Sequence, residues 1–242
     1  MKVSSNMSHP LTARLHENPY RRQLIDHAFF RQVRESPVTR EQAAIFIGQW
    51  WHPLHYFPTF LARSVAVLPD IESKSAIARI LNQETGEGNS SRAHEVIYID
   101  TMARAGFTNE QSAGTAPYRE TATLVEGYRN AADARLSALG FVFATEVADL
   151  VMVSGIGMAV RRATGATDLE WVDIHVEQEP DHVEHADYTM MMTFDDAEEQ
   201  KLVASAEDMW RLWIAFFDRL QLEVFGRAPV DHAARTVAAS VH

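Results

Sequence analysis

Residues 138–160 read ALGFVFATEVADLVMVSGIGMAV, an apolar run of about the length that spans a membrane, with two acids near its centre. Glu146 and Asp149 would be costly in lipid, so the run predicts a buried core helix rather than a membrane span. A buried carboxylate without a partner is also costly, and Glu146 must therefore be protonated, ion-paired or bound to a cation. For a lone buried glutamate, a structural ion pair is the commoner explanation.

The same helical periodicity extends over the rest of the chain. Apolar residues recur at spacings of three and four, whereas strand-like alternation is scarce. We expect an all-α, single-domain bundle of about seven to eight helices over residues 1–242, with 228–242 as a loosely attached tail. The expected helices span residues 12–35, 39–67, 71–85, 90–106, 116–133, 135–163, 168–192 and 196–225.

Composition excludes several classes of function. A formal net charge of −11 disfavours nucleic acid or an anionic membrane as the partner, which leaves a small molecule or another protein. The absence of cysteine excludes disulfides, thiolate metal sites, iron–sulfur clusters and cysteine nucleophiles. The first twenty residues lack the apolar core of a signal peptide, so we expect a cytoplasmic protein.

The strongest local signal lies in WVDIHVEQEPDHVEHADYTM, residues 171–190. His175, Glu179 and His182 stand at i, i+4 and i+7, which places them within roughly 60° of one another on a helix. They can therefore direct three metal ligands into one volume, although a solvated acidic face with incidental histidines is the alternative. Pro180 costs about 3 kcal/mol inside a helix and is expected to kink it or open a turn. His185, one turn beyond His182, could donate a hydrogen bond to a metal ligand or contact the substrate, or it could simply be exposed.

Glu84 and His94 flank a helix break in LNQETGEGNSSRAHEVIYI, residues 81–99. Glycines at 86 and 88, with Asn89, can end one helix in left-handed conformations, and Ser90 or Ser91 can begin the next. Glu84 then lies in a last turn and His94 in a first turn. Considered alone, the two residues would be interpreted as solvated surface groups.

Together these segments resemble a known family. The order Glu84-x9-His94, then Glu146 in a hydrophobic helix, then His175-x3-Glu179-x2-His182 resembles the heme-oxygenase-like diiron oxidases, which share their fold with thiaminase-like and pyrroloquinoline-quinone synthase proteins. The resemblance covers roughly residues 40–220. It implies a heme-oxygenase-like bundle, a homodimer and two iron ions, cycling between ferrous and ferric states, held by these six residues. Glu179 departs from the pattern, where Asp is frequent.

The resemblance also implies an activity. The irons would activate dioxygen, with an external electron donor, to oxidise an amino-acid-like or fatty-acid-like molecule by N-oxygenation, desaturation or oxidative carbon–carbon cleavage. Three carboxylates and three imidazoles suit iron or manganese and bring about −3 of charge to two divalent cations. A ferritin-like site needs two Glu-x-x-His motifs, and this chain has one, from Glu179 to His182.

Other functions are known for proteins with this fold. A cofactor-free oxidase resembling pyrroloquinoline-quinone synthase needs no iron, and a non-catalytic helical protein could bind a metal or ligand without turnover. A thiaminase-like hydrolase depends on a cysteine, and a haem oxygenase would use His16 or His27 but place the acids against haem propionates. Aromatic residues in 46–60 predict core packing, or a pocket wall in which Arg63, with His52 and His55, could hold a substrate carboxylate.

Overall fold

The computed structural model describes residues 10–226, apart from the side chain of Glu179. These residues form ten α-helices, a 3-10 turn (η1) and a short π-helix (η2), and contain no strand. The elements are α1 (Pro10–His16), α2 (Pro19–Ile25), α3 (Ala28–Glu35), α4 (Arg40–Val67), α5 (Ile71–Glu84), η1 (Ser90–Arg92), α6 (His94–Arg104), η2 (Glu110–Gly114), α7 (Arg119–Ala131), α8 (Arg135–Thr164), α9 (Glu170–Thr189) and α10 (Asp196–Phe225). The all-α class is confirmed. The expected tail, 228–242, lies outside the described residues.

The predicted count of seven to eight helices was too low, because the helix expected over 12–35 is three helices. The Asn18 side chain accepts a hydrogen bond from the Tyr20 amide, and Pro19 follows it in the first turn of α2. His27 caps α3 by accepting from the Phe29 amide at 3.1 Å. Each cap begins a new helix where the apolar periodicity continues, so periodicity alone did not reveal the breaks.

Helix α8 is the centre of the bundle and packs mainly against α10, α9 and α4. Within the described part of the chain, it is the one helix long and apolar enough to cross a membrane, and 72% of its most apolar stretch is buried. Glu146, in the middle of that stretch, is buried with it. The packing is therefore that of the predicted core helix.

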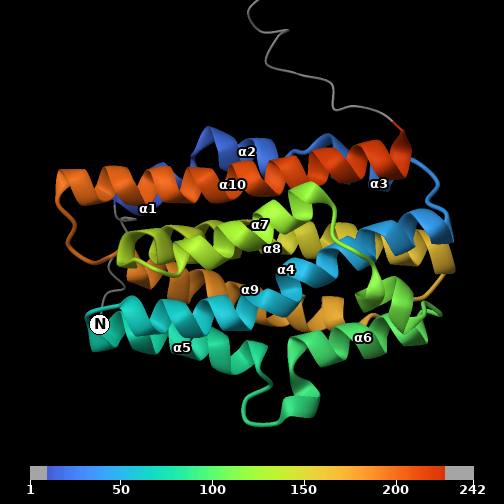
Figure 1. Ribbon diagram of the computed structural model, residues 1–242, viewed down its shortest axis with the longest axis horizontal. Helices are drawn as coiled ribbons and strands as arrows, with labels where there is room; N and C mark the ends of the chain where they lie inside the picture. The colour runs from blue at the N-terminus through green and yellow to red at the C-terminus, as the bar shows by residue number, and fades with distance from the viewer. Residues whose placement is uncertain (1–9, 227–242) are drawn as a thin grey trace, which may run out of the picture.

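The other helices lie on either side of this centre (Figure 1). α10 packs with α1, α2 and α3 on one side, while α5 and α6 lie on the opposite side against α4 and α9. The turn that joins α5 to α6 therefore approaches α9. α9 is α-helical without interruption from Glu170 to Thr189, with Pro180 in its interior. The opened turn expected at Pro180 is therefore absent from this helix, whereas a kink there stays a prediction.

Candidate metal centre

The α5–α6 turn brings Glu84 and His94 together, since Glu84 is the last residue of α5 and His94 the first of α6. Gly86 and Gly88 adopt φ of 85° and 87°, as predicted, but the third left-handed residue is Glu87 rather than Asn89. Asn89 instead caps η1 by accepting from the Ser91 amide. α6 begins after Ala93 without a side-chain cap, so the expected serine cap was wrong.

Gly86 is the position in this turn where a side chain cannot fit. A Cβ there would lie 2.2 Å from the carbonyl oxygen of Asn89 and 2.6 Å from the amide of Ala93, whereas a Cβ at Gly88 meets nothing within 4 Å. Because both glycines have positive φ, alanine at either position carries about 1 kcal/mol of backbone strain. We expect Gly88→Ala to cost only that, and Gly86→Ala to cost about 3 kcal/mol. Urea unfolding of the two variants measures the difference, and equal losses would contradict the prediction.

Three of the predicted ligands form one buried cluster. Glu84, His94 and His175 are each at most 5% exposed, and one ligand atom from each lies within 4.8 Å of the other two. His94 Nδ1 is 3.1 Å from Glu84 Oε2, and the rings of His94 and His175 are 4.7 Å apart. Three segments distant in the sequence therefore present a carboxylate and two imidazoles to one volume.

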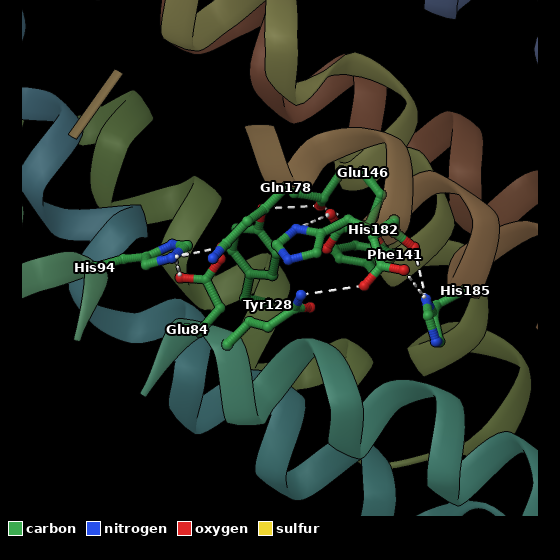
Figure 2. Close-up of polar contacts among 11 residues, drawn as sticks. Glu84, His94, Tyr128, Phe141, Glu146, Gln178, His182 and His185 are labelled. Carbon is green, nitrogen blue, oxygen red and sulfur yellow. Dashed lines mark hydrogen bonds and ion pairs between the residues drawn. The ribbon is translucent and has the colours of Figure 1, made fainter. Parts of the chain in front are cut away.

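A second pair lies beside the first cluster (Figure 2). Glu146 on α8 and His182 on α9 are each 2% exposed, with Glu146 Oε2 3.2 Å from His182 Nδ1. Among the described residues, neither Glu146 Oε1 nor His182 Nε2 has a hydrogen-bond partner. Such buried polar atoms are costly to leave unpartnered, so both are free to bind a ligand that enters the site.

Both groups contribute to the lining of one cavity of about 30 Å³, the first through Glu84 and His175 but not His94, the second through Glu146 and His182. The volume corresponds to about two water molecules. Its remaining wall is mostly apolar and aromatic and includes Trp50, Pro53, Leu54, Phe57, Trp171 and Trp213. The cavity thus combines the charged and imidazole groups with a largely apolar and aromatic lining.

The neighbours of these groups determine their protonation. Burial opposes ionisation of Glu84, but His94, His175 and His182 outweigh it and lower the pKa of Glu84 to about 2. Burial and then His94 lower the pKa of His175 to about 3. Burial also acts against a charged His182, yet Glu146 raises its pKa to about 9. At neutral pH Glu84 and His175 are therefore in metal-binding forms, whereas His182 must first lose a proton.

The structure does not bring every candidate residue to this cavity. The Glu179 side chain lies outside the described part of the molecule, although its backbone belongs to α9. Arg63 is ion-paired with Asp133 and donates to Tyr56, away from the cavity lining. His185 Nδ1 lies 2.6 Å from the Asp181 carbonyl oxygen, and the side chain is set apart from Glu84 and His94 (Figure 2). It lines a separate groove between α5 and α9.

The other histidines named as candidates from the sequence make their contacts outside the cavity. His16 and His27 pair with Asp187 and Asp218, each at 3.0 Å, and neither lines the cavity. His52 and His55 line a different surface groove. The geometry of this site therefore does not support haem ligation by His16 or His27. It also does not support a role for His52 and His55 in binding a substrate carboxylate here.

Sequence reasoning missed several residues around the centre. Gln178 lies 3.0 Å from His94, and its position three residues after His175 was a usable helical signal. Asp149, three residues after Glu146, lines the cavity and could have been found in the same way. Tyr128 and Thr145 share a hydrogen bond beside the cavity. Tyr128 comes from α7, and no local pattern connected it to the ligands.

The fold is that of heme-oxygenase-like proteins. The solved structure of a domain of unknown function with a heme oxygenase-like fold from Shewanella denitrificans aligns with a TM-score of 0.69 and 17% identity, over 84% of this chain and 88% of that one. A CADD-like protein of unknown function from Nostoc punctiforme aligns with a TM-score of 0.72 and 14% identity, over 88% and 95% of the two chains.

Sequence comparison identifies the family within this fold class. The chain belongs to the family of iron-containing redox enzymes, whose model matches residues 44–215. A curated relative, 4-chloro-allylglycine synthase of Streptantibioticus cattleyicolor, is 24% identical over 162 residues, which make up 65% of this chain and 62% of that protein. The match thus spans less than two thirds of the relative's length.

Proposed function

We propose that this chain is a non-haem diiron oxidase or oxygenase that uses dioxygen to oxidise a small organic substrate. The observation that carries the proposal is the convergence of Glu84, His94 and His175 on one volume beside the Glu146–His182 pair. Family membership supports iron and redox chemistry, while the number of ions and the use of dioxygen belong to the proposal.

The donor set fits iron. Carboxylate oxygens and imidazole nitrogens suit ferrous and ferric ions, and no thiolate is present to favour zinc or a cluster. The unpartnered atoms of Glu146 and His182 support a cation at this place, because a bound ion would satisfy both. We assign as ligands Glu84, His94, Glu146, His175, Glu179 and His182.

Two ions fit the arrangement better than one. The first cluster contains a carboxylate and two imidazoles, and the second pair adds a carboxylate and an imidazole across the same cavity. Glu84 lies close enough to His175 and His182 for both imidazoles to lower its pKa, although the two histidines belong to different groups. Glu84 would therefore be available to metal held by either group of ligands, and as a carboxylate it would bring negative charge to the site.

Bound ferrous iron would supply electrons for the reduction of dioxygen, and an external donor would restore them. The chain's own contribution is to hold the ligands in a buried, mostly apolar space. Trp50, Leu54 and Trp213 exclude bulk water from the ligand atoms and offer contacts to the carbon skeleton of a substrate. Among the residues that line the cavity, Asp149 is partly exposed and all the others are buried, so we assign the entrance to the wall beside Asp149.

The substrate that we favour is amino-acid-like rather than fatty-acid-like, because the curated relative is named for an amino-acid product. Such a molecule exceeds a cavity of about 30 Å³, so side chains that line the cavity must move to admit it. N-oxygenation, desaturation and carbon–carbon cleavage are all open to a centre of this composition.

Anaerobic loading with ferrous iron tests the proposal. After excess metal is removed, we expect about two irons to remain per chain, and oxygen uptake by the iron-loaded protein but not by a zinc-loaded control. Retention of less than one iron per chain would refute the metal centre. Oxygen uptake by the metal-free protein would then indicate a cofactor-free oxidase, and its absence a binding protein.

A further inference from the structure

Both ring nitrogens of His94 have a defined neighbour. Nε2 lies 3.0 Å from Oε1 of Gln178, and Nδ1 lies 3.1 Å from Oε2 of Glu84. An amide oxygen can only accept, so Nε2 must carry the proton that makes this hydrogen bond. In the neutral imidazole that binds a metal, the lone pair is then on Nδ1, which makes no hydrogen bond in the described part of the chain although it lies close to the Glu84 carboxylate.

His175 is held in the opposite tautomer. Its Nδ1 lies 2.7 Å from the carbonyl oxygen of Trp171, one turn earlier in α9. Because a carbonyl also only accepts, this Nδ1 carries the proton and Nε2 keeps the lone pair. The two imidazoles of one cluster would therefore present different nitrogens to the same volume.

We propose that Gln178 is a positioning residue that fixes His94 to bind metal through Nδ1, while His175 binds through Nε2. This inference rests on the proposed function. α9 thus supplies the ligands His175 and His182 and also orients a third ligand from α6. His94 needs such support because α6 begins at this residue without a side-chain cap. A hydrogen bond from a ligand's second nitrogen fixes the tautomer and the orientation of the ring.

The direct test is nuclear magnetic resonance of zinc-loaded protein with ¹⁵N-labelled histidine. Long-range proton–nitrogen correlations show which ring nitrogen carries hydrogen and which binds the metal. We expect hydrogen on Nε2 of His94 and on Nδ1 of His175. Metal bound through Nε2 of His94 would overturn the inference and leave the metal centre itself intact.

Variants of Gln178 supply the second readout. Gln178→Met removes the acceptor and keeps the length of the side chain, so zinc and ferrous affinities should fall about 10- to 100-fold. Gln178→Glu keeps an acceptor oxygen and should remain within a few-fold of the unchanged protein. Gln221→Met is the matched control, since Gln221 is a buried glutamine bonded to Gln32 on the far side of the bundle.

The outcomes separate the two proposals. Wild-type affinity in Gln178→Met would refute the role of Gln178 while supporting the centre. Equal losses in Gln178→Met and Gln221→Met would assign the effect to stability and also refute the role. A parent protein that binds neither zinc nor iron would refute the proposed function, and the inference with it.

Discussion

Glu146→Ala is expected to abolish stable binding of at least one iron ion and, with it, oxygen uptake. Glu146 is 2% exposed, faces the cavity and has one oxygen without a hydrogen-bond partner in the described part of the chain. Its removal deletes one of the proposed carboxylate ligands and the negative charge paired with His182. Loss of a residue that only hydrogen-bonds to a metal ligand lowers metal affinity by about 10- to 100-fold. Loss of a ligand itself should cost more, so we expect iron affinity to fall by more than about 100-fold.

The fold should survive this substitution. Alanine is the better helix former, and the space left by the carboxylate adjoins an existing cavity. Circular dichroism should therefore show unchanged helix content, while iron per chain after desalting should fall. The matched control is Glu95→Ala, which breaks a similar Glu–His pair, 2.7 Å from His55, at an exposed position. Full iron loading of Glu146→Ala would show that this residue is not a ligand.

Sequence reasoning predicted most of the fold because apolar periodicity is a local signal. The long helices α4, α5, α8 and α10 agree with their expected spans to within a residue or two. It did not predict the breaks between α1, α2 and α3, where a single capping side chain changes the path of the chain while the periodicity continues. A cap contributes only about 1 kcal/mol, too little to be visible in a periodic pattern.

Several residues of the site were also predictable from signals that are local in the sequence. His175 and His182 share a helical stripe, and a glutamate in the apolar segment around 146 is conspicuous, so both signals are local. The Nδ1-directed orientation of His94 depends on Gln178, in a helix 84 residues away, and no spacing rule connects the two. The geometry confirms the convergence of these segments, whereas their binding of iron stays a prediction.

The last prediction concerns the pH dependence of the metal-free protein. The pKa of His182 is raised to about 9, so its contribution to stability is complete below pH 6.5 and is lost as the pH rises through 9. The expected loss in the free energy of unfolding is about 3 kcal/mol. His175 and Glu84 have lowered pKa values, so their contributions are lost as the pH falls from 6.5 toward 3 and from 4.5 toward 2. Stability should therefore be greatest near pH 6.5.

Urea unfolding at a series of pH values measures this profile. His182→Gln should remove the alkaline decline because the group that loses its proton is gone, whereas His185→Gln, one turn further along α9, should keep it. Zinc loading should also flatten the alkaline side, since metal-bound His182 is already neutral. If the loaded and metal-free proteins declined in parallel above pH 6.5, His182 would be an ion-pair partner of Glu146 and not a ligand.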